Sequence, residues 1–125
     1  SDFQISLKNV HPAGIIKVDE KIYVITWERG LGAKYYILQL NEKGEELSKI
    51  RLKRIHEPAH IAWDGKHYWV TSWYNDLIYK VDLEGLEVVG SFKSPANKTT
   101  GIAWDGKHLW ITGTYDDLYK VKIAK

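Results

Sequence analysis

The chain of 125 residues contains no cysteine and no methionine. The absence of cysteine excludes disulfide bonds, thiol catalysis and thiolate metal sites, and it leaves the redox compartment open. Because lysine and glutamate are abundant, the absence of both sulfur-containing residues is compatible with a thermophilic source.

The chain also lacks a strong charge of either sign and a long apolar run. Its formal net charge is only +2, from 18 basic and 16 acidic residues, and the lysines are spread along the chain. This balance does not indicate a nucleic-acid partner. No apolar run approaches the length of about 18 residues that a membrane span needs, and the N-terminus shows no signal-peptide pattern. We therefore expect a soluble protein without a membrane partner, and we favour the cytoplasm.

The chain does contain one clear pattern, which occurs three times. Two copies read HIAWDGKHYWVTSWYNDLIYKVD from His60 and GIAWDGKHLWITGTYDDLYKVKI from Gly101, and a weaker copy, IIKVDEKIYVITW, precedes them. Their aspartates, Asp19, Asp64 and Asp105, are 45 and 41 residues apart. A period of about 40–45 residues with strand-like content is typical of β-propeller blades of four strands each. The sequence therefore predicts an all-β propeller with three blades of antiparallel strands per chain.

Each copy follows one strand template, from an innermost strand A to an outermost strand D. In blade one we expect strands at 14–18, 21–27, 34–41 and 46–53, and in blade two at 59–63, 67–73, 77–83 and 87–93. Blade three has strands at 100–104, 108–114 and 117–123 and lacks a strand D. The predicted organisation is a single half-ring domain, 1–125, with an N-terminal segment 1–10 and blades at 11–54, 55–95 and 96–125.

The strand that blade three lacks has a counterpart at the N-terminus. Ile5–Ala13 matches Ile50–Ala59 with one gap, so Phe3–Lys8 reads as an outer strand D without a blade of its own. Propellers have about four to eight blades, so three are not expected to close a ring. We predict a six-bladed homodimer in which this segment completes the third blade of the other chain. The residues that would close the ring are Phe3, Ile5 and Leu7. The alternative is a piece of a longer single-chain propeller.

The two clear copies resemble blades of the NHL, YVTN and streptogramin-lyase-like propellers. That group has a Gly-Ile-Ala-Val-Asp-like first strand, a Trp-Val-Thr-like second strand and an Asn-x-Ile-x-Lys-Val-like third strand, and this chain has GIAWD, YWVTS and NDLIYKV. Such motifs mark turns and core positions in enzymes, scaffolds and binding proteins alike, so the resemblance implies a fold and little about activity. Lyase members use a His/Glu and metal arrangement, which no stretch here matches residue by residue.

Ligands of propellers usually meet the mouth formed by the D–A connections and the B–C loops. His60 is notable there because glycine occupies its place in the other copies, as Gly14 and Gly101, so the repeat does not demand a histidine. It is interpreted either as a ligand or general-base histidine or as an ordinary polar residue at the mouth. The candidate ligand-binding residues are Trp27, Glu28, Arg29, His60, Trp73, Tyr74, Asn75, Thr100, Tyr115 and Asp116. The alternative for the tryptophans is that they seal interfaces between blades.

The chain has no strong metal, nucleophile or cofactor signature, so we assign no catalytic residue, metal or cofactor. The favoured function is a non-catalytic binding or scaffold propeller whose aromatic-rich mouth recognises a protein, a peptide or a glycan. One alternative is a lyase-type or hydrolase-type enzyme, with His60 and Glu28 from two subunits paired at the two-fold axis. Another is a structural module of a larger assembly. Enzymatic activity therefore stays open.

Overall fold

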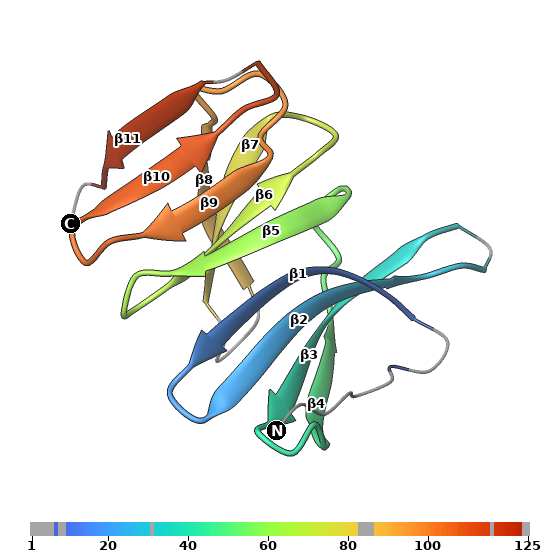
Figure 1. Ribbon diagram of the computed structural model, residues 1–125. Helices are drawn as coiled ribbons and strands as arrows, with labels where there is room; N and C mark the ends of the chain where they lie inside the picture. The colour runs from blue at the N-terminus through green and yellow to red at the C-terminus, as the bar shows by residue number, and fades with distance from the viewer. Residues whose placement is uncertain (1–6, 8–9, 31, 83–86, 116, 124–125) are drawn as a thin grey trace. The chain divides into compact units, whose positions relative to one another are not determined.

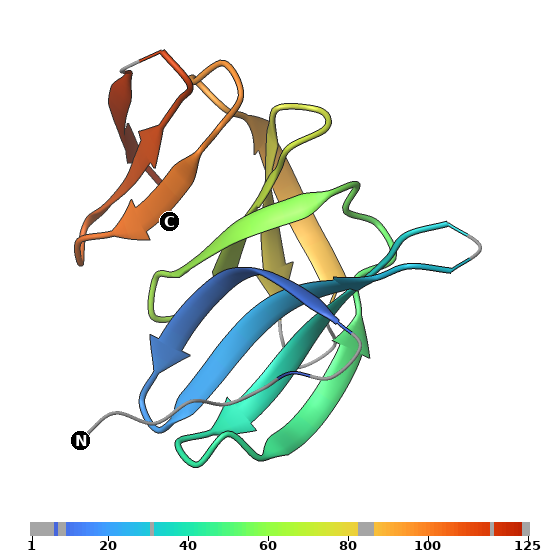
Figure 2. The same ribbon diagram turned by 45° about the vertical axis from the view of Figure 1, so that its right-hand side comes forward.

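The computed structural model describes residues 7, 10–30, 32–82, 87–115 and 117–123. Within these ranges all regular elements are β-strands. They form two four-stranded sheets and one three-stranded sheet, all antiparallel, in which strands that follow one another along the chain lie side by side (Figures 1 and 2). This arrangement confirms the predicted all-β class. No described residue belongs to a helix that is long and apolar enough to cross a membrane.

The strands lie close to their predicted positions. The first sheet contains β1 (His11–Val18), β2 (Lys21–Glu28), β3 (Lys34–Asn41) and β4 (Glu46–Arg51). The second contains β5 (Pro58–Trp63), β6 (Tyr68–Ser72), β7 (Leu77–Asp82) and β8 (Glu87–Lys93). The third contains β9 (Gly101–Trp104), β10 (His108–Thr112) and β11 (Leu118–Lys122). Strands β3 and β8 have the predicted bounds, and the other strands differ at their ends.

The chain divides into two compact units, Ser1–Leu52 and Lys53–Lys125. The first unit holds the first sheet, which is apolar on both faces. On one face Ile25 lies opposite Ile37, and both side chains are fully buried. The other face carries a cluster of Val24, Leu38 and Leu40, with Leu7 and Ile22 packed against it. A sheet with two apolar faces is one that is covered on both sides.

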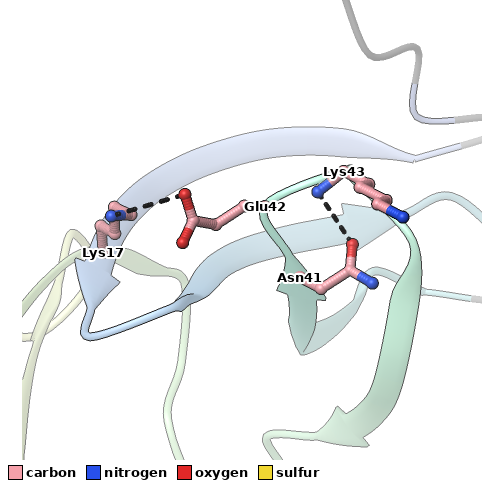
Figure 3. Close-up of polar contacts among 4 residues, drawn as sticks. All are labelled: Lys17, Asn41, Glu42 and Lys43. Carbon is pink, nitrogen blue, oxygen red and sulfur yellow. Dashed lines mark hydrogen bonds and ion pairs between the residues drawn. The ribbon is translucent and has the colours of Figure 1, made fainter.

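A polar turn ends the hairpin between β3 and β4. The side-chain Oδ1 of Asn41 accepts the main-chain N–H of Lys43 at 3.0 Å, as Figure 3 shows, and that of Glu45 at 2.9 Å. Such an Asx turn fixes the hairpin by satisfying local donors. The nearby ion pair between Lys17 and Glu42, at 3.9 Å, is exposed on both sides and contributes little, about 0–1 kcal/mol.

The second unit is held together by a core between the second and third sheets. From the second sheet come Ala62, Trp69 and Ile78, and from the third sheet come Leu109 and Ile111, and none of the five is more than 4% exposed. The third sheet therefore covers one face of the second, as neighbouring blades do in a propeller repeat.

The repeated Asp-Gly-Lys-His turn is a hydrogen-bonded clip that holds a tryptophan. Asp64 Oδ1 accepts the main-chain N–H groups of Lys66 at 2.8 Å and His67 at 2.7 Å, while Asp64 Oδ2 accepts the indole N–H of Trp69 at 2.8 Å. The third sheet has the same three bonds, from Lys107, His108 and Trp110 to Asp105. In both turns the histidine contributes its main-chain N–H to the aspartate.

These bonds favour the ionised carboxylates. The pKa of Asp105 is lowered to about 2 by the Trp110 indole and by the main-chain N–H groups of His108 and Lys107. Burial on its own would raise the pKa of Asp64, but the bonds from His67, Trp69 and Lys66 outweigh burial, so that the pKa is lowered.

We expect the stability of the protein to fall as the pH is lowered from about 5 towards 2. Both carboxylates have a lower pKa in the folded chain than in the unfolded chain, so protons bind preferentially to the unfolded chain. Urea unfolding midpoints between pH 7 and pH 2 measure the effect. The double variant Asp64→Asn, Asp105→Asn should be less stable at pH 7 and lose less on acidification. An equally steep loss in this variant would contradict the assignment.

The first sheet departs from this turn, and its strands are offset by one residue from the spacing of the aspartates. Val18 lies opposite Lys21 across a two-residue turn, whereas Trp63 lies opposite Tyr68 across a four-residue turn. The strands therefore repeat with a period one residue longer than the spacing of Asp19 and Asp64. A turn of different length leaves the aspartates in similar sequence positions while it shifts the strand register.

Candidate functional site

One end of the second unit is organised by the loop 94–100, which connects β8 to β9. Lys98 N–H donates to Asp76 Oδ1 at 3.2 Å, which attaches the loop to the turn between β6 and β7. Thr114 N–H donates to the Asn97 carbonyl at 3.3 Å, and Thr114 Oγ1 donates to the Lys98 carbonyl at 3.1 Å. The loop therefore joins the β6–β7 turn of the second sheet to the β10–β11 connection of the third.

The interior of this loop is closely packed. The buried hydroxyls of Ser94 and Thr99 are hydrogen-bonded at 2.6 Å, and Ala96 N–H donates to Ser94 Oγ at 3.1 Å. Gly113, at the end of β10, lies directly under the loop. A Cβ at this position would approach the Ala96 Cβ to 2.9 Å and the Asn97 carbonyl oxygen to 3.2 Å. The loop can therefore pack this closely only on a glycine.

Ser72, at the end of β6, is fully buried and holds the β6–β7 turn in place. Its hydroxyl donates to the His56 carbonyl at 2.5 Å and accepts the N–H groups of Tyr74 at 3.2 Å and Asn75 at 3.4 Å. The Tyr74 ring stacks on the His56 imidazole, with a centroid separation of 4.6 Å and an interplanar angle of 25°. The turn and the ring that it carries are thus held in one arrangement.

Three large aromatic side chains remain exposed on these two connections. Trp73 is 45% exposed, Tyr74 62% and Tyr115 71%. We call these three residues the aromatic end of the second unit. Exposed rings on fixed turns offer flat apolar faces without a large ordering cost on binding.

Two of the predicted binding residues instead support this end structurally. The side chain of Asn75 accepts Leu77 N–H at 3.2 Å and donates to Tyr79 Oη at 2.7 Å. Thr100 Oγ1 is hydrogen-bonded to Thr112 Oγ1 at 3.0 Å. Both side chains already have intramolecular partners.

His60 lies in β5 at the irregularity in the pairing of β5 with β6, and Gly14 holds the matching position in β1. The His60 main-chain N–H donates to Thr71 Oγ1 at 3.0 Å. Burial lowers the pKa of its imidazole, so the ring is neutral at pH 7. In the third copy the equivalent position is Gly101, and glycine is needed there for a steric reason. A Cβ on Gly101 would approach Thr112 Oγ1 to 2.9 Å.

The first unit carries its own aromatic stack at the end of β2. The Trp27 ring stacks with the His11 imidazole at a centroid distance of 4.3 Å, and the Arg29 guanidinium carbon lies 5.5 Å from the Trp27 centroid. Glu28 is paired with Lys49 at 2.7 Å, and this hydrogen bond raises the pKa of Lys49. The Glu28 carboxylate is therefore already neutralised by a cation.

The predicted binding residues thus belong to two separate units. Trp27, Glu28 and Arg29 lie in the first unit, and His60, Trp73, Tyr74, Asn75, Thr100 and Tyr115 lie in the second. Asp116, Phe3 and Ile5 lie outside the described residues. Sequence reasoning missed the supporting residues Ser72, Asp76, Lys98 and Gly113. The sequence offers one signal for these supporting residues. Ser72 and Gly113 occupy the same position at the ends of two otherwise similar strands, yet they are different residue types.

The described residues contain no cluster of side chains that would support a metal site. No group of three or more histidine, aspartate or glutamate side chains there is placed to hold an ion.

Comparison with known proteins was made by sequence and by structure. No protein-family model matches the sequence, and no curated protein matches it. Among solved structures, the β-propeller domain of the Trilobed protease from Pyrococcus furiosus matches 92% of this chain with a TM-score of 0.56 and 17% identity. The fold is a β-propeller.

Two further propeller-like matches agree. Glutaminyl cyclase from Myxococcus xanthus matches 93% of this chain with a TM-score of 0.64 and 15% identity, and a streptogramin B lyase matches 100% with a TM-score of 0.53 and 16% identity. This chain spans 74% of the cyclase but only 45% of the lyase and 40% of the protease domain. At such identities the matches show the propeller fold alone.

Proposed function

We propose that this propeller is a non-catalytic binding module that recognises a protein, peptide or glycan through the aromatic end of its second unit. The observation that carries the proposal is the exposure of Trp73, Tyr74 and Tyr115 on two connections that loop 94–100 joins. Exposed tryptophan and tyrosine side chains on a pre-formed support are the usual energetic centres of binding surfaces.

The surroundings of the aromatic end suit a ligand with both apolar faces and hydrogen-bonding groups. The half-buried, neutral His60 lies on strand β5, which pairs with β6 at the start of the turn that carries Trp73 and Tyr74. Sugar rings and the side chains of peptides both combine flat apolar faces with hydrogen-bonding edges.

The catalytic alternative receives less support from the charges. It needs Glu28 as a free partner for His60, but the Glu28 carboxylate is held by Lys49 at 2.7 Å.

The test is a binding screen of the 125-residue chain against a glycan array and a displayed peptide library. For any ligand found, we expect Tyr74→Ala and Tyr115→Ala each to raise the dissociation constant by about 10-fold or more, since loss of an aromatic centre costs roughly 1.4 kcal/mol or more. The matched control is Val89→Ala, which removes an apolar side chain that is 51% exposed on β8.

The proposal fails if bound ligands are insensitive to both tyrosine variants. If Val89→Ala weakened binding more than the tyrosine variants do, the binding surface would lie on β8 instead. A screen that yields no ligand, with a macromolecular partner contacting only the outer strands, would favour the structural-module alternative.

A further inference from the structure

The aromatic end of the second unit presents the same ring twice. Tyr74 and Tyr115 are 41 residues apart, which is also the spacing of Asp64 and Asp105 in the two clear copies of the repeat. The two rings are 62% and 71% exposed. A ligand that touches both tyrosines therefore meets the same kind of contact twice, which favours a ligand made of repeating units.

The ring of Tyr74 has one covered face and one open face. The His56 imidazole stacks on it with a centroid separation of 4.6 Å and an interplanar angle of 25°. Because the side chain is 62% exposed in spite of this contact, the opposite face is open to solvent. Tyr74 thus offers a flat apolar surface whose orientation the histidine beneath it fixes.

The backbone at this end is held in strained conformations. Three residues with side chains have a left-handed backbone, with φ of 47° at Glu57, 55° at Asp76 and 55° at Lys98. Residues persist in such conformations where their surroundings impose them. Here the Glu57 carbonyl accepts Trp73 N–H at 3.0 Å, and the Asp76 carbonyl accepts Ser94 N–H at 2.8 Å. A ligand therefore does not have to order these connections as it binds.

The main-chain N–H groups beside the rings are already used within the protein. Those of Trp73, Tyr74 and Thr114 donate to the Glu57 carbonyl, the Ser72 hydroxyl and the Asn97 carbonyl, respectively. A peptide that binds in extended form gains much of its affinity from free main-chain groups of its receptor. The side-chain rings, rather than the backbone, are what this end offers to a ligand.

The charges around the rings are balanced. In the connections 52–57, 73–76, 94–100 and 113–117, the described charged residues are three basic and three acidic ones, namely Lys53, Arg54, Lys98, Glu57, Asp76 and Asp117. A balanced set of charges attracts neither an acidic nor a basic polymer. The end therefore suits a neutral ligand.

From these observations we infer that the aromatic end binds a neutral polysaccharide of glucose-configured sugars, with one sugar ring on the open face of Tyr74 and another on Tyr115. The inference rests on the binding function proposed above and names its ligand class. In such sugars the polar substituents lie around the edge of the ring, so the faces present C–H groups that pack on an aromatic ring. A chain of linked sugars reaches both tyrosines, and two weak contacts combine into stronger binding.

The experiment titrates the 125-residue chain with cellohexaose and with chitohexaose in a calorimeter. These are neutral chains of β-linked glucose and N-acetylglucosamine, respectively. We expect at least one of them to bind. The corresponding disaccharide, cellobiose or chitobiose, should bind about 10-fold or more weakly, because it reaches only one tyrosine.

Two pairs of variants test the stacking. Tyr74→Ala and Tyr115→Ala should each raise the dissociation constant of the hexasaccharide by about 10-fold or more. The matched variants Tyr74→Phe and Tyr115→Phe keep the ring and remove only the hydroxyl, so their affinity should stay within about threefold of the unmodified chain. Phenylalanine variants that bind as weakly as the alanine variants would overturn the stacking. Circular dichroism of each variant checks that it is folded.

The outcomes separate the ligand class from the binding function. Binding of neither hexasaccharide overturns the inference. If displayed peptides then bind and lose affinity in Tyr74→Ala and Tyr115→Ala, the aromatic end remains a binding surface, with a peptide as its ligand. A hexasaccharide that binds all four variants as tightly as the unmodified chain would overturn both the inference and the proposed role of the aromatic end.

Discussion

Replacing Trp69 by alanine is expected to destabilise the second unit by about 3–5 kcal/mol, the usual cost of removing a large buried aromatic side chain. Trp69 is 4% exposed, packs between the second and third sheets, and meets Phe92 edge to ring at a centroid distance of 5.7 Å. Its indole N–H also donates to Asp64 at 2.8 Å. Urea unfolding followed by circular dichroism measures the loss.

Two companion variants separate packing from hydrogen bonding. Trp69→Phe keeps most of the buried ring but removes the indole donor, so we expect a smaller loss. Leu47→Ala removes an apolar side chain that is 51% exposed on β4 and should change stability by less than about 0.5 kcal/mol. A Trp69→Ala protein as stable as Leu47→Ala would show that the two sheets do not share this core.

Replacing Gly113 by alanine is expected to destabilise the protein by about 1–3 kcal/mol, the usual cost of overpacking a well-filled site. The added methyl group would approach Ala96 Cβ to 2.9 Å and the carbonyl oxygen of Asn97 to 3.2 Å, and the hydrogen bond between the buried hydroxyls of Ser94 and Thr99 leaves loop 94–100 little room to yield. Because this loop supports the Tyr115 connection, ligand affinity at the aromatic end should fall together with stability.

Gly90→Ala is the matched control for this substitution. Gly90 lies in β8 with an ordinary backbone conformation, and a methyl group added to it would meet no other atom within 4 Å. Alanine there should be neutral or stabilise by about 0.4–1 kcal/mol, since it restricts the unfolded chain. Equal effects of the two substitutions would mean that the loop does not pack tightly on Gly113.

The fold can be predicted from the sequence because its signals are local and repeated. Strand-like segments recur in each copy and Asp-Gly turns in two of them, and the predicted bounds of β3 and β8 agree with the observed ones. The three strands β9, β10 and β11 of the third sheet are also evident from the repeat. The two-residue turn at Asp19 is not, because the spacing of the aspartates does not show that Val18 pairs with Lys21.

The site is harder to predict because exposure depends on tertiary contacts. Asn75 and Thr100 are polar residues on connections, and sequence alone does not show that their side chains bond within the protein. The sequence does single out Tyr74 and Tyr115, and both are exposed, but the support that fixes them comes from Asp76 and Gly113. The loop residue that bonds to Asp76 lies 22 positions further along the chain, beyond the reach of local patterns.

The sequential strand order of all three sheets has a kinetic consequence. Each strand pairs with the strand that precedes or follows it in the chain, so the chain closes only short loops while the sheets form. Short loop closure means a low contact order, and low contact order favours rapid folding. Each sheet can therefore assemble as soon as its own residues are available, before the later copies of the repeat exist to compete for its strands.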